Sequence, residues 1–208
     1  AKFELEFIRN ILQILEKDSK QKINIKYTGV KDFKSSFISL EAGEKDQTLL
    51  INNVSITESR KKVYDFSEPY IFNKYALMSK KNYFFKDDET KKRVGVRIGG
   101  FAETLSKNLH EEFPVEVKGY KSLPLAQKAL GKEIDMILSD YIMVWAFNLK
   151  LIKIYKPDLS NDFAIMYKKG SVLKDQIDAA MQKFKKTDQF KKLIKKHFAN
   201  FENLFFES

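Results

Sequence analysis

The chain opens with apolar side chains at a four-residue spacing: Phe3, Phe7, Ile11 and Leu15. This spacing places them on one face of the chain and predicts an amphipathic helix. In 23–27, apolar and polar positions alternate instead, which predicts a strand. A second, shorter helix is predicted from Phe33 to about Gly43, because its apolar positions are again three or four residues apart and a glycine commonly ends a helix.

Further along, short apolar runs alternate with helical patterns. Strands are predicted at 49–51, 75–78, 94–96, 115–117, 134–138, 152–155 and 163–167, and helices at 102–109, 125–131, 140–147 and 173–197. Strands that alternate with helices of about ten residues are typical of parallel βαβ units, whose sheets are covered on both faces. The pattern therefore predicts an α/β protein.

Two such α/β cycles predict two lobes. The connections near 75–79 and 161–166 have strand character, so the chain is expected to leave the first lobe, build the second and return. We expect lobe 1 to comprise 1–79 and 164–208, and lobe 2 to comprise 80–163. Two crossings form a two-stranded hinge about which the lobes would close, and the cleft between the lobes is the expected ligand site.

The residue types present exclude several kinds of chemistry. The chain has no cysteine, and its two histidines, His110 and His197, lie far apart in the sequence. This composition excludes disulfides, zinc sites built on cysteine and a histidine-rich metal site. Neither histidine has the context of a Ser-His-Asp triad, and 95–100 lacks the Lys-Ser/Thr of a phosphate-binding loop. We therefore expect no enzyme activity, no cofactor and no metal.

The formal net charge is +10, and it comes almost entirely from lysine. Of the 38 Lys and Arg residues, only four are arginine: Arg9, Arg60, Arg93 and Arg97. Nucleic-acid surfaces favour arginine for two-pronged contacts with bases and phosphates, and the lysines here are spread over predicted helices. We therefore expect no nucleic-acid partner. The scarcity of arginine marks each one as a candidate for a position that needs a planar guanidinium.

One stretch carries a strong family resemblance. Residues 55–70 read S-I-T-E-S-R-K-K-V-Y-D-F-S-E-P-Y. They resemble the signature of the family 3 extracytoplasmic solute-binding proteins of ABC transporters, roughly (T/S)-I-T-x-x-R-x-x-x-x-x-F-S-x-P-Y. The resemblance extends over nearly the whole chain, through V-G-V-R-I-G at 94–99 and through A-L-G-K-E-I-D and S-D within 129–140.

The resemblance implies a fold and a function. The fold is the two-lobed periplasmic-binding-protein type (type II), with the ligand held in the cleft between the lobes. The function is extracytoplasmic binding of a small polar solute, in the first place an amino acid. The implied partners are that small-molecule ligand and the membrane permease of an ABC transporter.

The resemblance implies four ligand-binding residues in lobe 1. Arg60 matches the arginine that clamps the ligand's α-carboxylate, and Ser55 matches a hydroxyl residue that hydrogen-bonds it. A guanidinium meets a carboxylate through two parallel hydrogen bonds, which agrees with such a role. Phe33 matches an aromatic residue that stacks along the ligand, and Asn53 stands where the family often has a glycine whose carbonyl contacts the ammonium. Simpler roles remain open: a surface arginine, a helix cap for Ser55 and a core position for Phe33.

The remaining candidates lie in lobe 2. Asp140 matches the acid that pairs with the ligand's α-ammonium, and it follows a strand at whose carboxyl end open α/β sheets bind ligands. Its alternative role is a helix cap. Arg97 matches a position that is often basic, and Gly99 and Gly100 are expected to present backbone N–H groups to an anion. The family commonly has Thr or Ser where this chain has Gly100, so one side-chain hydrogen bond to the carboxylate is missing.

The resemblance also leaves alternatives open. Residues 2–7 already match the family's first helix, so the strand and ligand-contacting loop that precede it are expected to be absent. The same module serves as the ligand-sensing domain of membrane signalling and cell-wall proteins, which is the alternative function. A third interpretation is a module that has lost its small ligand and binds a macromolecular partner through its basic surface.

Overall fold

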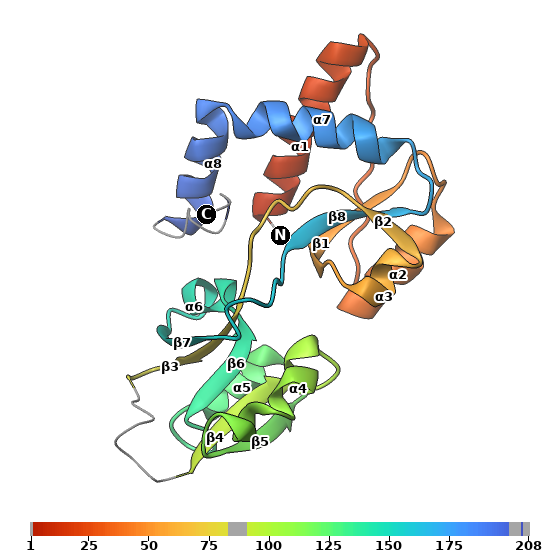
Figure 1. Cartoon of the computed structure of the whole chain (residues 1–208). Coiled ribbons are helices and arrows are strands. Elements are labelled where there is room, and N and C mark those ends of the chain that lie inside the picture. The colour runs from red at the N-terminus through yellow and green to blue at the C-terminus, as the bar shows by residue number, and fades with distance from the viewer. Residues whose placement is uncertain (1, 83–90, 200–204, 206–208) are drawn as a thin grey trace. The chain divides into compact units, whose positions relative to one another are not determined.

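The computed structural model describes residues 2–82, 91–199 and 205 (Figure 1). The chain divides into two compact units, one formed by Ala1–Phe72 with Asp162–Ser208 and the other by Asn73–Asn161. It therefore passes from one unit to the other twice, which is the connectivity of a two-lobed fold. Within the described ranges, no helix combines the length and the apolar character needed to cross a lipid bilayer.

The first unit combines a small sheet with helices at both ends of the chain (Figure 1). Its elements are α1 (Lys2–Ser19), α2 (Phe33–Ala42), β1 (Leu49–Ser55), α3 (Glu58–Lys61), β2 (Tyr64–Phe66), β8 (Phe163–Lys168), α7 (Leu173–Lys185) and α8 (Asp188–Phe198). Strand β8 lies between β1 and β2 and is antiparallel to both. The sequence pattern predicted parallel neighbours, and for this sheet that prediction is wrong, because the returning strand inserts between the two strands that α3 connects.

The predicted amphipathic face of the first helix is confirmed. In the first unit α1 packs against α7 and α8. The ring centroid of Phe7 lies 5.9 Å from that of Phe184 and 6.1 Å from that of Phe190, and all three side chains are buried. Packing of aromatic rings at this distance buries a large apolar area and stabilises the contact between helices distant in the sequence.

The second unit is built on a five-stranded mixed sheet of order β5-β4-β6-β3-β7. Its elements are β3 (Tyr75–Ser79), β4 (Lys92–Arg97), α4 (Phe101–Ser106), the 3₁₀ turn η1 (Leu109–Glu111), β5 (Val115–Tyr120), α5 (Leu123–Ala129), β6 (Met136–Asp140), α6 (Ile142–Ala146) and β7 (Lys150–Tyr155). Strand β4 is parallel to both β5 and β6, as the βαβ pattern predicted, whereas β3 is antiparallel to β6 and β7.

Two expectations from the sequence differ from the structure. The strand predicted at 23–27 is absent, because a strand is stabilised by pairing and this segment pairs with no described strand. The strand at 75–79 was expected to belong to lobe 1, with the boundary after residue 79. In the structure it is β3, which pairs with β6 and β7, so the compact units divide after Phe72 and again after Asn161.

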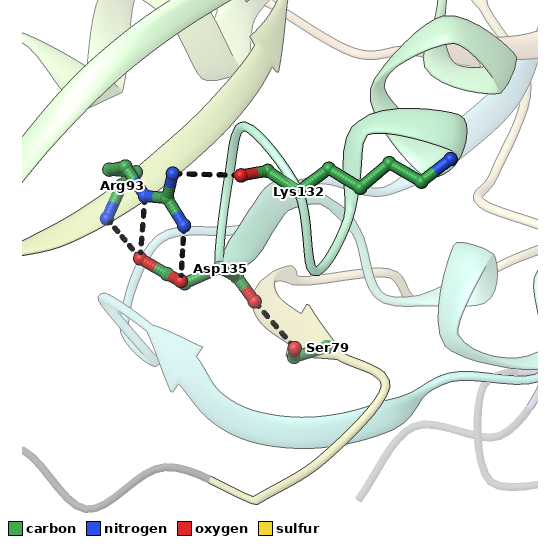
Figure 2. A network of polar contacts seen from close by, with 4 residues as sticks. All are labelled: Ser79, Arg93, Lys132 and Asp135. Carbon is green, nitrogen blue, oxygen red and sulfur yellow. Dashed lines mark hydrogen bonds and ion pairs between the residues drawn. The ribbon is translucent and has the colours of Figure 1, made fainter.

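One of the four arginines has a structural role in the second unit (Figure 2). The Arg93 side chain donates from Nε and Nη2 to the two carboxylate oxygens of Asp135, at 3.2 and 3.0 Å, and from Nη1 to the Lys132 carbonyl at 2.9 Å. These hydrogen bonds lower the pKa of the Asp135 carboxyl. Ser79 on β3 donates to the Asp135 carbonyl at 2.5 Å, so the network connects β4, β3 and the start of β6. A two-pronged guanidinium suits this position better than a lysine ammonium.

Candidate functional site

The first unit holds Arg60 in a defined position. Arg60 lies in α3, and its Nη1 donates a hydrogen bond to the backbone carbonyl of Ser55 at the end of β1, at 2.8 Å. Its guanidinium carbon lies 5.6 Å from the ring centroid of Phe33 and 5.3 Å from that of Phe37. Contacts of a cation with two aromatic faces are attractive and restrict the side chain. The structure therefore brings Arg60, Ser55 and Phe33 together.

The alternative roles of these three residues can be compared with the geometry. Thr57, and not Ser55, is the N-cap of α3, since its hydroxyl accepts from the Arg60 N–H at 3.2 Å. The capping role considered for Ser55 is therefore wrong. Phe33 is half-buried and packs against the core cluster that contains Leu40 and Val54, so it contributes to the core as well as contacting Arg60.

Asn53 lies at an irregularity in β1. The pairing of β1 with β8 shifts register between Leu50 and Val54, and Asn53 adopts a left-handed conformation with φ of 47°. Asparagine tolerates this conformation better than most residues. The backbone N–H of Asn53 donates to the Glu4 carboxylate at 2.8 Å and also lies 3.1 Å from the Tyr70 hydroxyl.

Glu4 and Tyr70 form a buried pair that our sequence reasoning missed. The Tyr70 hydroxyl donates to Glu4 Oε1 at 2.9 Å. Tyr70 is 0% exposed and Glu4 is 7% exposed. Burial raises the pKa of the Glu4 carboxyl, and the hydrogen bonds from Tyr70 and Asn53 oppose this. Burial and the neighbouring Glu4 raise the pKa of Tyr70. The sequence signal was an acidic residue on the apolar face of the first helix, three positions before Phe7.

In the second unit, Asp140 ends β6 and is held by two asparagines. Asn73 Nδ2 donates to Asp140 Oδ1 at 3.2 Å, and Asn161 Nδ2 donates to the same oxygen. Burial raises the pKa of Asp140, while the Asn161 hydrogen bond, the positive charge of Arg97 and the Asn73 hydrogen bond oppose the rise. Asp140 is not the cap of α6: the Ile142 N–H at its start donates to Asn73 Oδ1, at 3.3 Å. Sequence reasoning did not identify either asparagine.

The glycine turn after β4 differs from the expectation. Gly99 has a φ of 81°, a left-handed conformation that favours glycine. Its N–H donates to Glu103 Oε1 at 3.3 Å, and the Gly100 N–H donates to the Arg97 carbonyl at 3.2 Å. Both N–H groups expected to receive an anion therefore have partners, Gly99 in α4 and Gly100 in the turn itself. Gly100 is the N-cap of α4 and provides no side-chain hydrogen bond there.

Two hollows of the second unit, of about 480 and 340 Å³, border the amino ends of β4 and β5. Lys91 and Val115 line the larger hollow, and Glu116 lines both. Arg97 and Gly99 lie at the opposite, carboxyl end of β4, so these hollows are separate from the candidate residues. Among the residues that the structure describes, no three His, Asp or Glu side chains gather as a metal ion would require.

Comparison with known proteins connects these observations. The family model of the bacterial extracellular solute-binding proteins, family 3, matches residues 3–200. The amino-acid-binding protein AabA of Dichelobacter nodosus is 30% identical over 209 residues, covering 95% of this chain and 79% of that protein. The arginine-binding extracellular protein ArtP of Bacillus subtilis is 27% identical over 176 residues, covering 80% of this chain and 68% of that protein.

Solved structures show the same fold. An ancestral arginine-binding protein bound to arginine superimposes with a TM-score of 0.64 at 25% identity, covering 92% of this chain and 87% of that chain. The GluR0 ligand-binding core of Nostoc punctiforme, in complex with L-glutamate, gives a TM-score of 0.66 at 21% identity over 93% of this chain and 91% of that chain. The match of the family model over nearly the full length is the decisive result: the chain belongs to the bacterial extracellular solute-binding proteins, family 3.

Proposed function

We propose that this protein binds a free α-amino acid outside the cytoplasm and presents it to the permease of an ABC transporter. The observation that carries the proposal is the similarity to the Dichelobacter nodosus protein, which is named as an amino-acid-binding protein and matches 95% of this chain. The protein acts by binding and release, and it catalyses no reaction.

Arg60 is the proposed partner of the ligand's α-carboxylate. Its guanidinium is held by the Ser55 carbonyl and by the faces of Phe33 and Phe37, so it loses little side-chain freedom when a ligand binds. A planar guanidinium can donate two parallel hydrogen bonds to a carboxylate. Ser55 and Phe33 are placed beside Arg60, where a hydroxyl and an aromatic face contribute a hydrogen bond and apolar contact to the same ligand.

Asp140 is the proposed partner of the α-ammonium. Both asparagine donors use Oδ1, and none of the hydrogen bonds found among the described residues uses Oδ2. An ammonium that leaves water needs a negatively charged partner, because an unpaired buried charge costs several kcal/mol, on the order of 3–5. The proposal therefore assigns the two ends of one amino acid to Arg60 and Asp140.

A ligand panel tests the proposal. Isothermal titration calorimetry of the full chain is carried out with the amino acids bound by relatives, L-arginine, L-histidine, L-cystine, L-glutamine and L-glutamate, and with the other common L-amino acids. We expect at least one to bind, and we expect its analogue without the α-amino group to bind far more weakly. Failure of all amino acids to bind, or equal binding of the analogue, would overturn the proposal.

A further inference from the structure

Two buried asparagines surround the candidate residue Asp140. Asn73 and Asn161 are 0% and 1% exposed, and they are the first and last residues of the second unit. A main-chain hydrogen bond from the Asn161 N–H to the Asn73 carbonyl, at 3.2 Å, joins them. Each side-chain amide then donates to Asp140 Oδ1. Three residues that are distant in the sequence therefore form one polar cluster at the carboxyl end of β6.

The partners fix the orientation of the amides. A carboxylate only accepts hydrogen bonds, so the Nδ2 group of each asparagine must face Asp140. For Asn73 the opposite end is also fixed, because its Oδ1 accepts the Ile142 N–H at 3.3 Å. Aspartate at either position would place a second negative charge beside Asp140, and an apolar side chain would remove one of the two donors to its carboxylate. Asparagine meets both requirements.

The cluster offsets part of the cost of ionising Asp140. Burial is the larger effect and raises the pKa of Asp140 overall, whereas the two amide donors and the positive charge of Arg97 on β4 oppose the rise. Because both amides occupy Oδ1, the carboxylate is held with its plane and its second oxygen in one orientation. A carboxylate that is fixed before the ligand arrives costs less to order on binding.

We infer that Asn73 and Asn161 are positioning residues, which hold Asp140 so that Oδ2 is presented to the ammonium group of the ligand. This inference rests on the proposed function and adds two residues to it that do not themselves touch the ligand. It also assigns a role in ligand binding to the two positions at which the chain enters and leaves the second unit.

Two measurements on the full chain test the inference, with Asn161→Ala and Asn73→Ala as variants. The first is the pKa of Asp140 in the ligand-free protein, followed by the ¹³C chemical shift of its carboxyl carbon. We expect this pKa to rise in both variants, because each loses a donor to the carboxylate. The second is the affinity, between pH 5 and 8, for the amino acid that binds most tightly in the panel. We expect about tenfold weaker binding for Asn161→Ala, with a larger loss at pH 5 than at pH 8.

The matched control is Asn108→Ala, which removes an exposed asparagine of the same unit. The control should change neither the pKa of Asp140 nor the affinity. An unchanged pKa of Asp140 in both variants would overturn the inference even if an amino acid binds to the unaltered chain. A raised pKa with unchanged affinity and pH profile would also overturn the positioning role, and the proposed function would stand. The pKa of Asp140 is measured without ligand. It therefore tests whether the two asparagines position Asp140 even if no amino acid of the ligand panel binds.

Discussion

The Glu4 carboxylate accepts a hydrogen bond from the backbone N–H of Asn53 at 2.8 Å, although the two residues are 49 positions apart. Glu4 lies on the buried face of α1, and Asn53 occupies the left-handed position in β1. The contact fixes the irregular part of β1 to the helix. It therefore connects the first helix of the chain to a strand that also contains the candidate residue Ser55.

Substitution of Glu4 separates the effect of its hydrogen bonds from that of its charge. Glu4→Ala removes the acceptor for the Tyr70 hydroxyl and the Asn53 N–H, so we expect the free energy of unfolding to fall by about 1–3 kcal/mol. Glu4→Gln keeps an acceptor oxygen and removes the buried charge, so its loss should be smaller at pH 8. Urea denaturation of both variants at pH 8 makes the comparison. Equal destabilisation by the two substitutions would contradict this explanation.

The raised pKa of Glu4 has a defined effect on the pH dependence of stability. In the folded state this carboxyl binds its proton more tightly than in the unfolded chain, so its contribution to stability is greatest below the unfolded value of 4.5 and falls as the pH rises through the folded pKa. Glu4→Gln should remove the decline in the free energy of unfolding that Glu4 causes above pH 4.5. Denaturation curves measured from pH 4 to pH 8 would show a flatter profile for the variant. A profile parallel to that of the unaltered chain would be the contrary result.

Arg60→Lys tests the proposed carboxylate contact. Lysine keeps the positive charge but loses the planar pair of donors, so we expect the affinity for the bound amino acid to fall by between about 10-fold and 100-fold. The melting temperature without ligand should change little, because α3 is exposed and short. Arg9→Lys, at an exposed position of α1, is the control. Calorimetry that finds equal affinities for the two variants would remove Arg60 from the site.

Local sequence patterns predicted much of the fold but few of its long-range contacts. The spacing of Phe3, Phe7 and Ile11 identified the buried face of α1, and all three are buried. The alternation in 23–27 failed as a strand signal, because a strand also needs a neighbour, which the pattern of one segment cannot supply.

The same limit applies to the candidate site. The motif at 55–70 pointed to Arg60 and Ser55, which are close in both sequence and space. Asn73 and Asn161 lie 67 and 21 positions from Asp140, and nothing in their neighbouring residues indicates that their amides meet one carboxylate. Such contacts depend on how strands align in the sheet, and only the folded structure gives that alignment.

Asp140→Asn tests the ammonium contact. Asparagine has nearly the same shape but no charge, so we expect the affinity for an amino acid to fall at least about a hundredfold. The ligand-free protein should be as stable as the unaltered chain or more stable at pH 7, because burial of the charged Asp140 carboxylate, which raises its pKa, costs free energy there. Asp158→Asn, at an exposed position of the same unit, is the control. A variant that binds normally but unfolds more easily would show that Asp140 has only a structural role.

Gly100→Ser examines the position where the family commonly has a hydroxyl residue. A Cβ on Gly100 would stand 3.4 Å from Arg97 Nε and from the Arg97 carbonyl oxygen, an ordinary contact distance, and the backbone there is extended with φ of −88°. The serine should therefore fit without strain. Its hydroxyl can cap α4, which we expect to raise the free energy of unfolding by about 0.3 kcal/mol, and it can donate to the ligand's carboxylate. We expect tighter binding, by about three- to tenfold, from one added hydrogen bond. Gly100→Ala, which adds the Cβ without the hydroxyl, is the matched control in calorimetry. If alanine and serine change the affinity equally, the hydroxyl makes no contact and the carboxylate lies elsewhere.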